Sequence, residues 1–176
     1  VRYVHAVIRK ALGDAVRWNL VARSVADAAD PPRQKRTQMQ TWNAEQLRTF
    51  LESVQGDPLY TAFALAATTG MRRGEVLGLT WKNVDLAAAR VSITQALTVV
   101  GGYELQFPEP KTASGRRMIA RDLQTVDALR EHRAAQLVDC SLMGDAYQDQ
   151  DLVFADGDGT PIHPRSFSRA FVDHVK

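Results

Sequence analysis

The chain has almost no sulfur and no long apolar run. Cys140 is the single cysteine among 176 residues, which excludes an internal disulfide framework and a cysteine-based zinc site and makes a reducing cytoplasm the default compartment. No apolar run approaches the roughly 20 residues that a membrane-spanning helix needs, and no signal peptide is visible. We therefore expect a cytoplasmic protein with no membrane partner.

Several common catalytic motifs are also absent. The sequence contains no Walker loop, no dinucleotide fingerprint, no HExxH and no serine nucleophile elbow. The run Asp156-Gly157-Asp158-Gly159 lacks the other ligands and the terminal glutamate of a calcium loop, so we interpret it as a turn. We expect no cofactor and no metal ion.

The composition is that of a globular protein, but the charge is unevenly distributed. Hydrophobic residues make up 45% and charged residues 24% of the chain. Residues 1–40 hold eight Lys and Arg against three Asp, a balance of +5, whereas residues 41–176 hold fourteen basic against seventeen acidic residues, a balance of −3. A basic start suits a polyanionic partner, although a solvated helix and linker explain the same charge equally well.

The pattern of apolar residues divides the chain at a proline-rich turn. Apolar residues recur at helical spacing over about residues 2–22. The apolar face of such a helix must pack against another element, because a single helix cannot bury it alone. Asp30-Pro31-Pro32 ends regular structure, and a polar, basic connector follows. We therefore predict a helical element within residues 1–32, a basic linker over 33–40 and a second domain over 41–176.

The second domain is predicted to be α+β and mostly helical. Asn43 and Gln46 form a capping-box pair, and Gly70 suits the left-handed position that ends a later helix. Other helices are predicted to begin at Asp57-Pro58, to run from Arg72 to about Trp81, to begin at Asp122, and to cover 166–175. Alternating segments at 90–99, 103–107 and 117–120 predict a small three-stranded antiparallel sheet.

The most informative stretch is TGMRRGEVLGLTW at residues 69–81, called here the arginine box. It places Arg72 at the start of a helix and Glu75 three residues later. A helix N-terminus offers free N–H groups, and a guanidinium oriented by a carboxylate can donate two hydrogen bonds to one phosphate. The pair therefore predicts a phosphate-binding site, called here the phosphate clamp. The alternative is a surface arginine, which would face an unfavourable helix dipole.

A second stretch, PKTASGRRMI at residues 110–119, is called here the lysine segment. It places Lys111 at the predicted tip of a hairpin, with Arg116 and Arg117 close behind. These cations can reach a bound phosphate backbone. The alternative is a turn lysine in water.

The two stretches, in this order, resemble the tyrosine recombinases of the phage integrase family. The arginine box matches T-G-x-R-x-x-E-x-x-x-L-x-W, and the lysine segment is similar to P-K-T-x-x-S-x-R. The resemblance implies that Arg72 contacts the scissile phosphate of double-stranded DNA, that Glu75 supports it, and that Lys111 protonates the leaving 5′ oxygen. Since an ordinary lysine titrates near 10.4, that role requires neighbouring cations to lower its pKa.

The resemblance extends more loosely over the rest of the chain. It implies that residues 1–32 are the C-terminal part of a helical core-binding domain and that 41–176 are the N-terminal portion of a catalytic domain. The linker would track along DNA through Arg33, Lys35 and Arg36, with further contacts from Arg116 and Arg117. In the family four protomers assemble on DNA, whereas we expect this chain alone to be a monomer.

The chain departs from the family pattern in one respect. None of the four histidines has an arginine at i+3, and all four tyrosines precede the position of the family's nucleophile; these residues are His5, His132, His163, His174, Tyr3, Tyr60, Tyr103 and Tyr147. We expect the parent protein to recombine DNA through a 3′-phosphotyrosyl intermediate and this chain alone not to cleave it. The alternatives are a DNA-binding module without chemistry, from a decayed integrase gene, and a helical domain with no nucleic-acid role.

Overall fold

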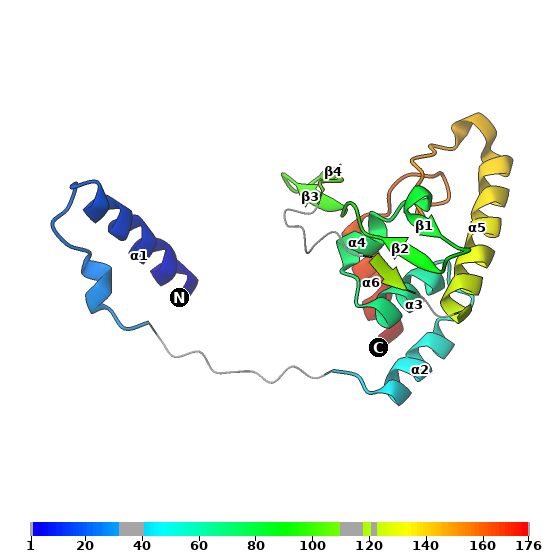
Figure 1. Cartoon of the computed structure of the whole chain (residues 1–176), viewed down its shortest axis with the longest axis horizontal. Coiled ribbons are helices and arrows are strands. Elements are labelled where there is room, and N and C mark those ends of the chain that lie inside the picture. Colours follow the sequence, from blue (N-terminus) through cyan, green and yellow to red (C-terminus); the bar gives the residue numbers. More distant parts are fainter. Residues whose placement is uncertain (1, 32–40, 110–117, 121–122, 176) are drawn as a thin grey trace. The chain divides into compact units, whose positions relative to one another are not determined.

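The structure is a computed structural model that describes residues 2–31, 41–109, 118–120 and 123–175 (Figure 1). The chain separates into two compact units, Val1–Thr41 and Trp42–Lys176. None of the described helices is both long enough and apolar enough to cross a membrane.

The first unit is built around helix α1, Arg2–Arg17. The helix is shorter than the predicted 2–22 because Asn19 takes a left-handed conformation, with φ of 58°. The N–H of Leu20 then donates to the carbonyl of Ala15 at 2.9 Å, which is the long hydrogen bond of a Schellman helix end. A short 3₁₀ turn, η1 (Val25–Ala28), is tied back to α1 by an ion pair between Arg9 and Asp27.

The second unit contains five α-helices among its described residues, two short 3₁₀ turns and five short strands. The helices are α2 (Ala44–Ser53), α3 (Tyr60–Thr69), α4 (Arg73–Leu77), α5 (Leu123–Met143) and α6 (Pro164–Val175), and the turns are η2 (Trp81–Asn83) and η4 (Gly144–Ala146). The strands are β1 (Val84–Asp85), β2 (Arg90–Ser92), β3 (Thr98–Val100), β4 (Glu104–Gln106) and β5 (Met118–Ala120).

The strands form two antiparallel sheets, in the order β1-β2-β5 and β3-β4. The α+β class is confirmed, but the predicted single sheet is wrong in its arrangement, because β5 pairs with β2 and the third strand is β1. The predicted strand over 90–99 is interrupted between β2 and β3. Ile93 and Leu97 are buried in the core there, so the chain leaves the sheet to fill the space beside α4.

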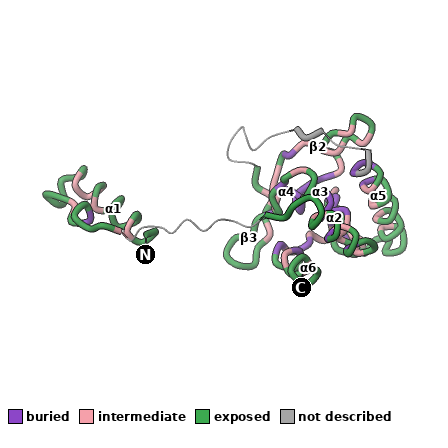
Figure 2. Tube along the Cα trace, turned by 90° about the horizontal axis from the view of Figure 1, so that it is seen from below, coloured by how far each residue is buried: buried purple, intermediate pink, exposed green. Residues whose placement is uncertain are grey.

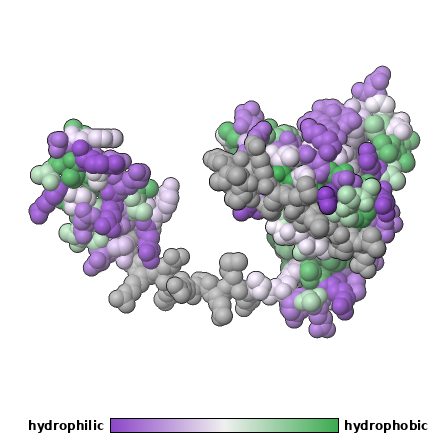
Figure 3. Space-filling model, in the orientation of Figure 1, coloured by the Kyte–Doolittle hydropathy of each residue, from purple (hydrophilic) through white to green (hydrophobic). Residues whose placement is uncertain are grey.

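Helix α3 lies at the centre of the core, with five consecutive buried residues from Thr61 to Leu65 (Figure 2). Phe63 on this helix packs against Phe50 of α2 and Phe167 of α6, with ring centroids 5.7 and 4.9 Å apart. By contrast, Figure 3 shows hydrophobic surface over the C-terminal part of α5, where Leu137 and Leu142 are exposed.

The predicted helix ends are confirmed where they depend on local chemistry. Asn43 Oδ1 accepts from the Gln46 N–H at 2.8 Å, and Gln46 Oε1 accepts from the Asn43 N–H at 3.0 Å. Gly70 ends α3 in the left-handed conformation, with φ of 63°. The predicted cap at Asp122 lies outside the described residues.

Candidate functional site

Arg72 and Glu75 lie together at the start of α4. Arg72 has an extended backbone and occupies the N-cap position of the helix. Glu75 Oε2 accepts from the Arg72 backbone N–H, and Glu75 Oε1 accepts from Arg72 Nη1, both at 2.8 Å. The Glu75 side chain is only 7% exposed, whereas that of Arg72 is 78% exposed. A buried carboxylate therefore orients an arginine that faces solvent.

Two glycines seat α4 against the chain that follows β2. A Cβ at Gly74 would lie 2.6 Å from the Leu97 carbonyl oxygen, and a Cβ at Gly78 would lie 2.8 Å from the Leu97 nitrogen. The absence of side chains lets the backbones touch, and the Leu97 N–H donates to the Gly74 carbonyl at 2.7 Å. Gln95 Nε2 donates to the Gly78 carbonyl at 2.9 Å. The helix that carries Arg72 is thus fixed at both ends.

Pairing of the residues after Gly78 with residues 152–153 explains why α4 is short. The sequence predicts a helix to about Trp81, but α4 ends at Leu77. Beyond Gly78 the chain becomes extended, Thr80 forms a bridge with Leu152, and the Val153 N–H donates to the Leu79 carbonyl at 2.8 Å. The sequence reasoning missed the role of the two glycines, although their spacing of four residues, which places them on one face of a helix, was a usable signal.

The other predicted site residues lie outside the described residues. These are Lys111, Arg116 and Arg117 of the lysine segment and Arg33, Lys35 and Arg36 of the linker. Two described contacts lie on either side of residues 110–117: the Ala96 N–H donates to the Pro108 carbonyl at 3.2 Å, and Met118, within the lysine segment, is paired with Ser92. Ala96 in turn adjoins Leu97, so one flank of the segment is anchored beside α4.

Arg73 and His163 take structural roles. Arg73 Nη1 donates to Ser168 Oγ on α6 at 2.6 Å, which links α4 to the last described helix. His163 Nδ1 accepts from the Arg165 N–H at 3.0 Å at the start of α6. Pro164 follows as the first helical residue, a position that suits proline because its missing N–H has no partner there.

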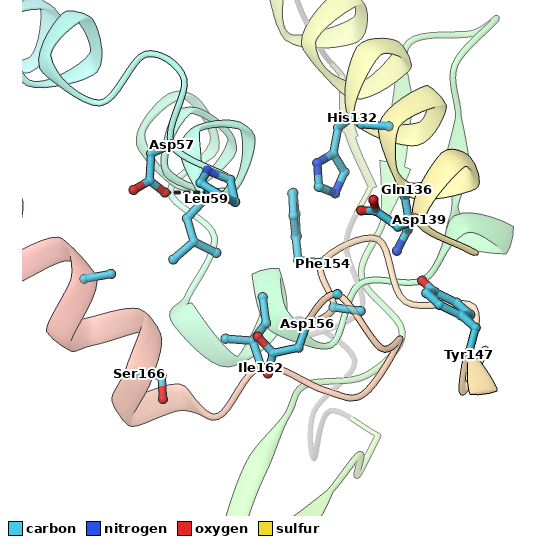
Figure 4. A pocket seen from close by; sticks show the side chains of 15 residues that line it. Asp57, Leu59, His132, Gln136, Asp139, Tyr147, Phe154, Asp156, Ile162 and Ser166 are labelled. Atoms are coloured by element: carbon cyan, nitrogen blue, oxygen red, sulfur yellow. Dashed lines mark hydrogen bonds between the residues drawn. The ribbon is translucent and has the colours of Figure 1, made fainter. Parts of the chain in front are cut away.

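A pocket of about 630 Å³ lies apart from the arginine box (Figure 4). His132 and Phe154 lie on one side of it, with ring centroids 5.1 Å apart, and Asp57 lies across from them. Three carboxylates, those of Asp57, Asp139 and Asp156, line the pocket. Since like charges repel a phosphate, this pocket is unsuited to a DNA backbone.

Burial and hydrogen bonds shift the pKa values of several groups in that region. His132 Nε2 donates to the Val153 carbonyl at 2.7 Å, and burial lowers the pKa of His132 despite this hydrogen bond. Burial, together with the nearby charge of Asp158, raises the pKa of Asp156. Hydrogen bonds from Thr160 lower the pKa of Asp158.

The aspartates of 156–159 belong to a turn, as predicted. Asp158 Oδ1 accepts from the Thr160 N–H at 3.0 Å, and Ala155 forms a bridge with Pro161. Over residues 2–31, 41–109 and 123–175, no group of three or more His, Cys, Asp and Glu side chains is placed to hold a metal ion.

Comparison with known proteins identifies the class of this fold and site. Residues 38–176 match the family model described as "Phage integrase family". The chain therefore belongs to the phage integrase family, and its resemblance to the tyrosine recombinases is confirmed.

Two curated relatives are similar to the chain. It is 25% identical over 171 residues to the ICEBs1 integrase of Bacillus subtilis. The matched stretch covers 96% of this chain and 46% of that protein. The chain is 27% identical over 125 residues to a tyrosine recombinase XerC-like protein of Caldanaerobacter subterraneus, spanning 66% of the chain and 32% of that protein. The chain thus spans less than half the length of either relative.

Solved structures show the same fold. The Tn1549 transposon integrase, in complex with a circular intermediate DNA, superposes with a TM-score of 0.75 at 19% identity, over 99% of this chain and 56% of that one. A lambda integrase dimer bound to a core site gives a TM-score of 0.65 at 13% identity, over 98% of this chain and 43% of that one.

Proposed function

We propose that this chain supplies the phosphate-holding half of the active site of a site-specific tyrosine recombinase that acts on double-stranded DNA. The observation that carries the proposal is the exposed Arg72 held by the buried Glu75 at the start of α4. Family membership supports DNA as the ligand of this arginine, since the solved structures with the same fold include integrases in complex with DNA.

In the proposed reaction the parent protein's tyrosine attacks the scissile phosphate and forms a 3′-phosphotyrosyl link. Arg72 donates to the phosphoryl oxygens, where negative charge increases in the pentacoordinate transition state, and Glu75 keeps the guanidinium in place. Lys111 protonates the leaving 5′ oxygen. The 5′ hydroxyl of the second strand reverses the step, so neither ATP nor a metal ion takes part.

The rest of the chain would hold the duplex. We assign DNA contacts to Arg33, Lys35 and Arg36 in the linker and to Arg116 and Arg117 beside Lys111. Residues 1–32 would be the C-terminal part of a core-binding domain and 41–176 the N-terminal portion of the catalytic domain. We further propose a cytoplasmic location, a tetramer of the parent protein on DNA and a monomeric state for this chain in solution.

This chain alone is proposed not to cleave DNA, because it contains neither the family's H-x-x-R motif nor a tyrosine beyond it. The second candidate function is therefore DNA binding without chemistry. Both candidates predict duplex binding, and they differ only in the activity of the protein from which the chain derives.

The test is duplex binding by the whole chain at several salt concentrations. We expect the logarithm of the binding constant to fall linearly with the logarithm of salt concentration, by about 0.9 for each phosphate contacted. We also expect no covalent adduct in a denaturing gel. Binding that is absent, or that is insensitive to salt, would favour a helical domain with no nucleic-acid role. A covalent adduct would show that the chain is active alone.

A further inference from the structure

We infer that a second phosphate-binding pocket, separate from the Arg72–Glu75 pair, lies between the β1–β2 hairpin and α5. The pocket has a volume of about 410 Å³, and we call it the hairpin pocket. Three cations from three different elements line it: Lys82 of η2, Arg90 of β2 and Arg133 of α5. All of its described lining residues follow α4 in the sequence, and neither Arg72 nor Glu75 is among them.

The three cations of the hairpin pocket are not neutralised by the protein. Among the described residues, none of Lys82, Arg90 and Arg133 takes part in an ion pair. One turn away on α5, Arg130 does pair, with Asp127 at 2.8 Å. Cations that line one pocket repel one another, and a bound anion would relieve that repulsion.

Among the described residues that line the hairpin pocket, Asp85 is the single carboxylate, and it is engaged in the hairpin turn. Asp85 is directly opposite Arg90 in the register of β1 and β2. Its Oδ1 nevertheless accepts from the N–H groups of Ala87 and Ala88, at 3.0 and 2.8 Å, and so closes the hairpin turn. Among the described residues, the Arg90 guanidinium has no carboxylate partner, and the described lining still carries a net positive charge when Asp85 is included.

Arg133 is held in position by an aromatic ring. Its guanidinium carbon lies 4.9 Å from the centroid of the Trp81 ring system. The indole is itself fixed, because Trp81 Nε1 donates to Gln136 Oε1 at 2.6 Å and Gln136 Nε2 donates to the Leu152 carbonyl at 3.0 Å. A guanidinium stacked on a ring keeps its in-plane N–H donors available, which suits bidentate contact with a phosphate.

We assign the backbone phosphate of duplex DNA as the occupant. The choice of DNA as ligand rests on the proposed function, whereas the pocket itself does not depend on Arg72 or Lys111. The pocket offers charge and hydrogen-bond donors, to which Ser92 adds a hydroxyl group, and contacts of that kind position a protein on DNA without reading its sequence. We therefore expect one additional phosphate contact, independent of base sequence.

The experiment measures duplex binding by the whole chain for Lys82→Gln, Arg90→Gln and the double variant. The charge-matched control is the double variant Arg48→Gln/Arg169→Gln, whose residues do not line the hairpin pocket. If one phosphate is bound, the salt slope of the Lys82/Arg90 double variant falls by about 0.9, which corresponds to about tenfold weaker binding at 0.1 M salt, and the control double variant changes less. All four substituted positions are exposed, and circular dichroism verifies that the fold is retained.

A second readout separates DNA from free phosphate. The Lys82 amine is labelled with an amine-reactive acetylating reagent in the presence of duplex DNA, or of inorganic phosphate at the same phosphate concentration. Protection by DNA alone supports the inference. Equal protection by inorganic phosphate, no protection, or a Lys82/Arg90 double variant that binds like Arg48→Gln/Arg169→Gln would overturn it and leave the proposed function standing. If the unmodified chain does not bind DNA at all, both proposals fail.

Discussion

The backbone of Leu97 rests directly on Gly74. The Leu97 N–H donates to the Gly74 carbonyl at 2.7 Å, and a Cβ on Gly74 would lie 2.6 Å from the Leu97 carbonyl oxygen. Gly74 is two residues after Arg72 and one before Glu75. The contact that joins α4 to the chain after β2 is thus built into the arginine box itself, and it positions the candidate phosphate clamp relative to the core.

Gly74→Ala is expected to destabilise the second unit by about 1–3 kcal/mol, because the added methyl group collides with backbone atoms that cannot rotate away. The matched control is Gly157→Ala, where an added Cβ meets no atom within 4 Å. Urea unfolding followed by circular dichroism gives both values. Equal stability of the two variants would show that α4 and residues 96–97 are not in close contact.

Glu75→Gln is expected to weaken duplex binding through Arg72 rather than by a contact of its own. Because Arg72 is largely exposed, we expect the pair to contribute about 0.2–1 kcal/mol, which corresponds to a loss of up to about fivefold in affinity. The double variant Glu75→Gln/Arg72→Gln is expected to bind no more weakly than Arg72→Gln. Additive losses in this cycle would mean that Glu75 acts independently of Arg72.

His132 is expected to make stability depend on pH. Burial holds its pKa below the ordinary value of 6.5, so the unfolded chain binds a proton more readily than the folded one. The contribution is neutral above pH 6.5 and becomes destabilising as the pH falls below that value, by at most about 1.4 kcal/mol per pH unit.

The measurement for His132 is the free energy of unfolding between pH 7.5 and 5 for the unmodified chain and for His132→Gln. Glutamine can still donate to the Val153 carbonyl but does not titrate. We expect the variant to lose part of the pH dependence, whereas His163→Gln, the control that removes one histidine at the start of α6, is expected to keep more of it. An unchanged pH slope in His132→Gln would contradict the account.

Sequence reasoning succeeded where a structure depends on residues close together in the chain. The Asn43–Gln46 capping box and the left-handed Gly70 are set by three or four neighbouring residues, and both were predicted. The sheets were predicted less well. Periodicity identified β-forming segments, but it carries no signal for pairing partners, so the roles of β1 and of the buried residues between β2 and β3 were missed.

The candidate site shows the same division. The contact between Arg72 and Glu75 follows from a spacing of three residues, and the structure has it. The predicted length of α4 was wrong because Leu79 and Thr80 pair with Val153 and Leu152, which lie far along the chain. The stacking of Arg133 on Trp81 joins residues that are far apart in sequence, and no local pattern indicates it.

The most direct test of the central claim compares Arg72→Gln with Arg48→Gln in duplex binding by the whole chain. Arg48 is an exposed arginine on α2, so the two variants lose the same charge. If the arginine held by Glu75 binds a DNA phosphate, Arg72→Gln lowers the salt slope by about 0.9 and weakens binding about tenfold at 0.1 M salt, whereas Arg48→Gln changes little. Equal binding by the two variants would contradict the assignment of Arg72 as a phosphate clamp.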